Sequence, residues 1–428
     1  MLWHVAIKEV HAHLLSLRYF VVSMMCITFA VSSIVLGGYQ YRKQIDTSKS
    51  YQLAGGWQGP PTLNFARRPP VLAVFGAGLD PVLGTHFILR EGARGGPQMA
   101  LDPQLVDPER LFGVLGPFDF EQVVVVLLSL VALLLAYDAI AGEREQGTLA
   151  LALANPLPRD TLLAGKVLGG CAVLLVPLAL GGGLGLGAAS LLFELPWGAE
   201  EAVRALAIFV LAGVYLGLFY VLGLVISVRS RSAAASLAVC LLAWATLVLV
   251  VPGLCGMGAQ ALRRTLSIGE LQSRRNAFWQ EVHQAMGVAY SEEFRQARKA
   301  GRDLDYDRLR KIDDVRSQEA ATRIQAMEAD YRTRMQGQME LVRTLAWATP
   351  VLSCRFSLDA LAQTGWADQV RFLSTIHLLE LKPKSGQPPR APLVESMAEA
   401  AGEVAMLVAT SVLLFAAAFW SFRRCSVQ

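Results

Sequence analysis

The feature that most restricts the fold of this chain is a set of six long apolar blocks, each close to the length of a membrane-spanning helix. A hydrocarbon core about 30 Å thick is crossed by roughly 20 apolar residues in a helix. The blocks cover residues 19–38, 123–140, 167–193, 205–228, 233–258 and 404–422. Their one charged residue is Asp138, near the end of the second block. Six such blocks could not share one soluble core, so the sequence predicts an all-α membrane protein with six transmembrane helices.

The composition excludes several other classes of protein. Only 17% of the 428 residues are charged and 54% are hydrophobic, whereas soluble domains carry about a quarter charged residues. A net charge of +4 is too small to indicate a nucleic-acid partner. The six cysteines show no C-x-x-C spacing, so neither a disulfide framework nor a zinc site is predicted. His4, His11 and His13 are interpreted as interfacial residues rather than metal ligands.

The charges between the blocks predict how the chain is oriented in the bilayer. The first block has no small-x-small cleavage site after it, so we interpret it as a retained helix and not a signal peptide. Residues 1–18 are expected to form a cytoplasmic or interfacial lead helix, with a simple extension of the first span as the alternative. Short cytoplasmic connections carry an excess of Lys and Arg. Here such connections contain Lys8, Arg18, Arg144, Arg159, Lys166, Arg229, Arg231, Arg423 and Arg424. This pattern predicts that both termini, including the tail 423–428, lie in the cytoplasm.

Two long segments are then expected to lie outside the cytoplasm. Residues 39–122 are rich in proline and are predicted to form a loop domain with short strand-like runs such as Val71–Phe75. Residues 259–403 are predicted to form a helical domain. Acid-to-base pairs at i,i+4 and an apolar stripe favour long helices there, and a break near Gly301 predicts a hairpin. The hairpin either packs only on itself or docks an extracytoplasmic partner.

The loop after the second span has a recognisable pattern. It reads Glu143-Arg144-Glu145-Gln146-Gly147-Thr148-Leu149, and then Asn155-Pro156-Leu157-Pro158-Arg159 and Gly165-Lys166. This resembles the ABC-2 type permease family, whose members carry E-x-x-x-G-T-L, a P-x-x-R turn and G-K entering the third span. The ending Phe419–Arg424 is similar to the last helix of that family. Ala348-Thr349-Pro350 and Leu358–Ala362 resemble a permease subgroup with a large helical insert between the fifth and sixth spans.

The resemblance implies a permease subunit of an ATP-binding cassette transporter, exporting a substrate with ATP that a separate ATPase subunit hydrolyses. It also implies a second permease copy or a paralogue, and a coupling helix in the cytoplasmic loop 141–166. The residues implied to contact the ATPase are Glu143, Arg144, Glu145, Gln146, Gly147, Thr148 and Arg159. Read from its residues alone, this loop could equally be an ordinary hydrophilic connection.

The motifs that the sequence lacks narrow the function further. No G-x-x-x-x-G-K-[ST] motif occurs, so the chain is expected to bind no ATP or other cofactor and to have no ATPase activity of its own. The alternative function is a mechanotransmission complex that acts on an extracytoplasmic partner without moving a substrate through the membrane. A membrane-embedded enzyme is disfavoured, because no acid–base or metal constellation is visible.

Two charged residues lie at the predicted membrane boundary, and one glycine cluster lies inside the third block. Asp138 is expected to reach headgroup water or to pair with Arg144 or Lys166. Lys166 is expected to anchor the third span at the headgroups. Glycines between 181 and 187 predict close helix packing, with a gate or a dimer seam as the alternative. Few polar residues line the spans, which leaves an apolar, amphiphilic or extruded cargo open.

Overall fold

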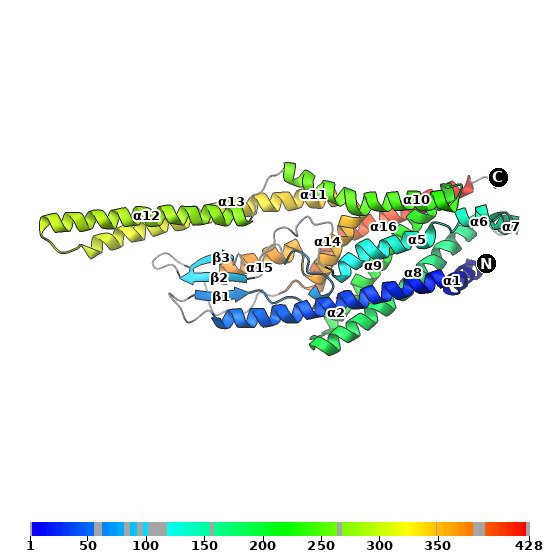
Figure 1. Ribbon diagram of the computed structural model, residues 1–428, viewed down its shortest axis with the longest axis horizontal. Helices are drawn as coiled ribbons and strands as arrows, with labels where there is room; N and C mark the ends of the chain where they lie inside the picture. Colours follow the sequence, from blue (N-terminus) through cyan, green and yellow to red (C-terminus); the bar gives the residue numbers. More distant parts are fainter. Residues whose placement is uncertain are drawn as a thin grey trace.

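The computed structural model describes residues 2–54, 62–80, 86–91, 97–101, 118–154, 158–262, 268–347, 349–379 and 390–424. Within these ranges six helical segments are long and apolar enough to cross a membrane, as predicted. They are Leu17–Ser50, Phe120–Glu145, Arg159–Phe193, Ala199–Arg229, Ala233–Leu262 and Leu393–Arg423. They lie in one elongated bundle, and both chain ends lie at the same end of it (Figure 1). The predominantly helical membrane fold is therefore confirmed.

The helices of the bundle extend beyond the apolar blocks. The elements are α1 Leu2–Leu14, α2 Leu17–Ala54, α4 Phe120–Gln122, the π-helix η4 Val123–Leu128, α5 Ser129–Ala136, α6 Ala141–Glu145, α7 Thr148–Ala154, α8 Arg159–Phe193, α9 Ala199–Arg229, α10 Ala233–Trp244, the π-helix η5 Ala245–Val250, α11 Val251–Leu262 and α16 Leu393–Arg423. The lead segment is a helix of its own, because the Ser16 hydroxyl accepts a hydrogen bond from the Tyr19 amide and caps α2. Helix α2 continues through residues 39–54, where a loop was expected, since that stretch contains no proline or glycine.

The glycines of α8 allow close packing, as expected. A Cβ atom at Gly181 would lie 2.9 Å from Ala30 of α2, and one at Gly182 would lie 2.1 Å from the ring of Phe209 in α9. Gly183 and Gly187, on another face of the helix, meet nothing within 4 Å. Backbones can approach this closely only where no side chain intervenes. These glycines therefore position α8 against both α2 and α9.

A small sheet lies beyond the bundle, next to the end of α2. Strands β1 (Thr62–Ala66), β2 (His86–Glu91) and β3 (Pro97–Leu101) are antiparallel in the order β1-β2-β3. Asn64 pairs with Ile88, and Ile88 pairs with Ala100. The strand expected at Val71–Phe75 is wrong, because Val71–Val74 form the 3-10 helix η1. Pro70 precedes it with φ −65°, and the Pro70 carbonyl accepts a hydrogen bond from the Ala73 amide.

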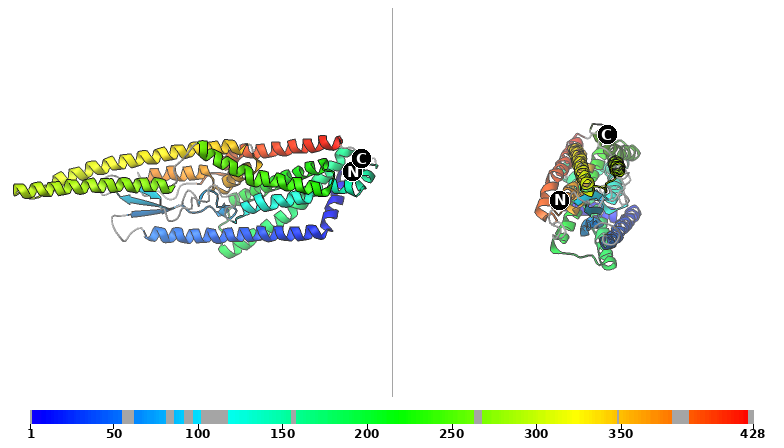
Figure 2. Two further views of the ribbon diagram at one scale, coloured as in Figure 1. Left: turned by 45° about the horizontal axis from the view of Figure 1, so that its top comes forward. Right: turned by 90° about the vertical axis from the view of Figure 1, so that its left-hand side faces the viewer.

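The predicted helical hairpin is confirmed. Helices α12 (Ile268–Ala300) and α13 (Tyr306–Ala346) run side by side and project from the bundle end opposite the termini (Figures 1 and 2). Gly301 ends α12 with φ +60°, a left-handed conformation that favours glycine. The Asp305 side chain then caps α13 by accepting from the Arg308 amide. The chain returns through α14 (Pro350–Ala362) and α15 (Trp366–Leu379), and the proline-rich return at 383–389 lies outside the described residues.

Candidate functional site

The candidate site surrounds the short helix α6, at the end of the bundle that holds both termini (Figure 1). The backbone amides of Ile140 and Ala141 donate to the hydroxyl of Ser227 in α9, at 3.1 and 2.9 Å. Ser227 is completely buried. The first amides of a helix have no partner within the helix. A side chain from another membrane span therefore caps α6 and ties its start to α9.

This cap gives a first testable prediction. The Ser227→Ala variant should unfold with a free energy about 1–2 kcal/mol lower than wild type, because two buried amides lose their acceptor. Ser230→Ala is the matched control, since the Ser230 hydroxyl donates to the Ile226 carbonyl of its own helix, at 2.8 Å. Thermal unfolding in detergent measures both variants. Equal loss of stability in the two would show that Ser227 does not hold α6.

A buried lysine joins α6 to two other helices. The Lys166 ammonium of α8 lies 2.8 Å from a carboxylate oxygen of Glu9 in α1 and 2.8 Å from one of Glu143 in α6. Only 2% of the Lys166 side chain is exposed. The expectation that Lys166 anchors the span at the headgroups is therefore wrong. Glu9 reaches Lys166 because Gly165 and Gly169 let α1 approach α8, where an added Cβ would lie within 2.7 Å of Val5 or Glu9.

Asp138 pairs with a residue that the sequence analysis did not connect to it. Its carboxylate lies 2.8 Å from the guanidinium of Arg18, at the start of α2, and not against Arg144 or Lys166. The same guanidinium lies 4.7 Å from the centre of the Tyr137 ring and donates to the Leu134 carbonyl. Both charged side chains are about two-fifths exposed. The pair fastens the end of the second span to the first.

Arg144 and Glu145 of α6 bind the turn between the fourth and fifth spans. The Arg144 guanidinium donates to the carbonyls of Val228, at 3.0 Å, and Ser230. The carboxylate of Glu145 accepts from the Ala233 amide at 3.1 Å, at the amino terminus of α10. A carboxylate there is favoured by the helix dipole. Through Glu143, Arg144 and Glu145, helix α6 is connected to α8, α9 and α10.

The structure therefore divides the seven residues implied to contact an ATPase. Glu143 and Arg144 are turned toward the chain's own helices, and the Arg159 guanidinium donates to the Arg423 carbonyl at 3.1 Å. Glu145, Gln146, Gly147 and Thr148 are exposed. Gly147 links α6 to α7 with φ +73°. The free surface at this end is thus formed by the junction of the two short helices and by α7.

Several residues of this site were missed by sequence reasoning. Leu151 of α7 is 71% exposed although it is a large apolar residue, whereas Leu149 beside it is buried. A single exposed leucine is common on protein surfaces, so Leu151 is a candidate contact residue only because it lies next to the exposed α6–α7 junction. The T-L-A-L-A-L-A pattern of 148–154 gives no hint of which leucine is exposed. The contacts that Glu9, Arg18 and Ser227 make with this site were missed because their partners lie far away in the sequence.

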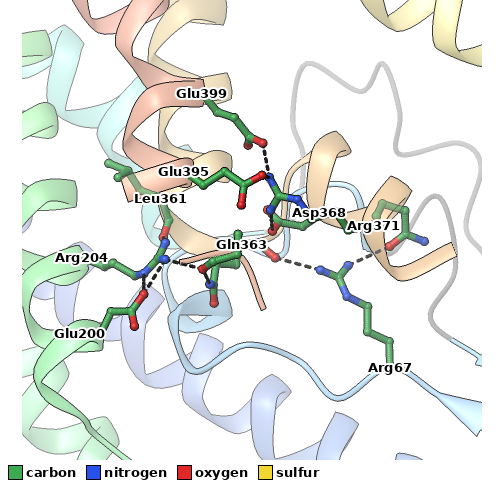
Figure 3. A network of polar contacts seen from close by, with 11 residues as sticks. Arg67, Glu200, Arg204, Leu361, Gln363, Asp368, Arg371, Glu395 and Glu399 are labelled. Atoms are coloured by element: carbon green, nitrogen blue, oxygen red, sulfur yellow. Dashed lines mark hydrogen bonds and ion pairs between the residues drawn. The ribbon is translucent and has the colours of Figure 1, made fainter. Parts of the chain in front are cut away.

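A second polar network lies at the opposite end of the spans (Figure 3). Arg204 of α9 is 1% exposed; it pairs with Glu200 at 2.8 Å and donates to the carbonyls of Leu361 and Ala391. Arg371 of α15 binds Glu395 and Glu399 at the start of α16. Close to them, Arg343 of α13 lies 2.5 Å from Glu403. A buried charge is tolerated only where it is paired or hydrogen-bonded, and here the partners come from different elements. The network therefore fastens the hairpin and α14–α15 to α9 and α16.

The same region contains a buried acid whose ionisation should affect stability. The Asp80 carboxylate lies 2.5 Å from Arg67, which also donates to Gln369 at 2.8 Å and to the Gln363 carbonyl at 3.0 Å. Burial raises the pKa of Asp80 to about 6, although the Arg67 guanidinium opposes the shift. The folded state therefore binds this proton more tightly than the unfolded state does.

The raised pKa of Asp80 gives a second prediction. Its contribution to stability should be complete below about pH 4 and be lost as the pH rises through about 6. Relative to the Asp80→Asn variant, wild type should lose on the order of 2 kcal/mol of unfolding free energy between pH 4 and pH 7. Thermal unfolding of both proteins in detergent across this range measures the difference. A difference that is constant with pH would contradict the assignment.

Comparison with known proteins identifies a family of transporter proteins that matches nearly the whole chain. A model of the ABC-2 family of transporter proteins matches residues 3–427. A probable ABC transporter permease protein NosY of Pseudomonas aeruginosa is 46% identical over 93 residues, 22% of this chain and 29% of that protein. The protein of the same name from Stutzerimonas stutzeri is 41% identical over 117 residues, 26% of this chain and 41% of that protein. The matched segments thus span less than half of each relative.

Proposed function

Because the chain belongs to the ABC-2 family of transporter proteins, we propose that it is the permease subunit of an ATP-binding cassette transporter in an inner membrane. The similarity to proteins named as probable permeases supports this assignment. Both termini and α6–α7 would face the cytoplasm, and the sheet and the hairpin would face the other side. We also propose that the chain belongs to the subgroup with a large helical insert, and the two long helices α12 and α13 support this.

The observation that carries the proposal is the way α6 is held. Ser227, Lys166, Arg144 and Glu145 connect this five-residue helix to α1, α8, α9 and α10. A separate ATPase subunit that binds the exposed α6–α7 surface would therefore push on several spans at once. A ligand shifts a conformational equilibrium only through contacts that differ between the states, so the ATPase would contact α6–α7 differently with and without ATP. Two copies of the permease, or this chain and a paralogue, would act together with two ATPase subunits.

Purification of the tagged chain from its own membranes tests this function. An ATP-binding subunit should be recovered with it, and the complex should hydrolyse ATP, whereas the chain alone should not. Recovery of no such subunit under mild detergent conditions, or ATP turnover by the isolated chain, would contradict the proposal.

One observation favours the alternative of mechanotransmission to an extracytoplasmic partner. The hairpin is fastened to a membrane span, since Arg343 of α13 binds the Glu403 carboxylate and the Glu399 carbonyl of α16. Motion of α16 would therefore reach the projecting hairpin. Replacement of residues 272–340 by a short linker separates the two functions. An exporter should keep directional movement of some compound, whereas a transmission device should lose all function and still bind its ATPase.

A further inference from the structure

An open apolar groove runs along the membrane-spanning part of the molecule between α8, α9 and α16. It has a volume of about 930 Å³. Among the residues that line it are Leu175, Gly183, Phe209, Gly213, Val412 and Phe415, and no charged residue belongs to the lining. Its rim is open to the surroundings, because Leu206, Val210 and Val412 are each about three-fifths exposed. On α8 the groove extends from Val167 to Gly183, which corresponds to about 24 Å of helix rise.

The two ends of this groove carry opposite charge. Eight residues beyond the lining, toward the chain termini, the three helices carry Arg159, Arg229 and Arg423, and Arg424 follows directly. The acids nearby are Asp160 and the two carboxylates of Glu9 and Glu143, which are paired with Lys166. The hydrogen bond from Arg159 to the Arg423 carbonyl brings the ends of α8 and α16 together. At the other end, Glu194 follows the last residue of α8, and the first turn of α9 contains Glu200 and Glu201. Glu200 pairs with Arg204 at 2.8 Å and Glu194 lies 4.0 Å from Arg42, so the three acids outnumber the two cations there. An anionic group beside the groove is therefore favoured only at the arginine end.

We propose that an anionic glycerophospholipid occupies this groove, with an acyl chain along the apolar lining and its phosphate among the arginines. Acyl chains match the lining, and the length of the groove lies within the roughly 30 Å of a hydrocarbon core. Basic residues next to a membrane attract anionic headgroups. A second copy of this chain is a poorer occupant, because a copy with the same orientation would place its own arginine end beside this one. In the orientation proposed above, the lipid belongs to the cytoplasmic leaflet.

Native mass spectrometry of the full chain in detergent tests the proposal without an ATPase. The probes are dioleoylphosphatidylglycerol and dioleoylphosphatidylcholine, which share acyl chains and differ in headgroup charge. Wild type should retain the anionic lipid at least tenfold better. Arg423→Gln/Arg424→Gln should abolish most of this preference, since each basic residue near the headgroups contributes about fivefold. The matched control is Arg298→Gln/Lys299→Gln, which removes two adjacent exposed cations from the end of α12 and should leave the preference unchanged.

A second pair of variants tests the groove itself. Gly183→Leu places a side chain in the groove, whereas Gly187→Leu, one turn further along α8, does not; a Cβ at either position meets nothing within 4 Å. Only Gly183→Leu should lower retention of both lipids. Equal retention of the two lipids by wild type, or no effect of Gly183→Leu, would overturn the proposal. So would a crosslinked dimer formed through Val412→Cys in membranes, which would place a second copy in the groove.

Discussion

Replacing Lys166 by methionine should destabilise the end of the molecule that holds α6 by about 3 kcal/mol or more. Glu9 and Glu143 would then face one another without the ammonium that each contacts at 2.8 Å. Removing one partner from a buried ion pair costs about 3–5 kcal/mol, since the remaining charge stays buried and uncompensated. The shift in thermal unfolding midpoint of the purified chain in detergent measures the effect.

The matched control neutralises the whole cluster. The triple variant Glu9→Gln/Glu143→Gln/Lys166→Met should recover most of the lost stability, because replacing a buried ion cluster by neutral groups is often close to neutral. Arg334→Met breaks the pair with Asp330 on exposed α13 and should change stability by less than about 1 kcal/mol. If Lys166→Met were as mild as Arg334→Met, the cluster would not connect α1, α6 and α8.

Substituting Leu151 by aspartate should lower the affinity of the chain for the proposed ATPase subunit at least thirtyfold, with little change in the stability of the chain alone. Leu151 is 71% exposed beside the polar surface of Gln146 and Thr148. Fully burying a leucine side chain contributes about 1.5–3 kcal/mol, and a carboxylate in its place would be buried without a partner at such a contact. Titration of the detergent-solubilised chain with purified ATPase subunit gives the Kd.

Val315→Asp provides the control for this prediction. Val315 is also exposed, at 57%, but it lies on the hairpin at the opposite end of the molecule. It should leave the Kd unchanged. An unchanged Kd in Leu151→Asp, together with normal ATPase activity of the complex, would mean that the ATPase binds elsewhere on the chain.

The six spans and the hairpin could be predicted because their signals are local. An apolar block of about 20 residues has one stable conformation in a bilayer, and a glycine between two charged amphipathic stretches predicts a reversal of the chain. Helix limits were predicted less well. Helix α2 continues 16 residues past the predicted end at residue 38, because polar helix formers carry the helix out of the apolar region without any change that hydropathy detects.

For the loop after the second span, local sequence signals predict the element but not the direction in which each side chain points. The motif predicted that residues 143–148 form one functional element, and it could not predict that Glu143 and Arg144 face the interior while Gln146 and Thr148 face outward. This division depends on Ser227 and Lys166, which lie 87 and 23 residues from their partners Ile140 and Glu143. Asp138 was assigned the wrong partners for the same reason.

The amino-acid sequence by itself determined that this chain has six helical segments long and apolar enough to cross a membrane, and it located the loop in which the family pattern occurs. Apolar transfer free energy depends on composition along a short stretch, so no knowledge of neighbouring helices is needed. Only the tertiary structure decided which charges are paired, which face of α6–α7 is exposed, and that three spans enclose a groove. Those properties depend on how glycines in α8 let other helices approach, and hence on contacts between residues that are distant in the chain.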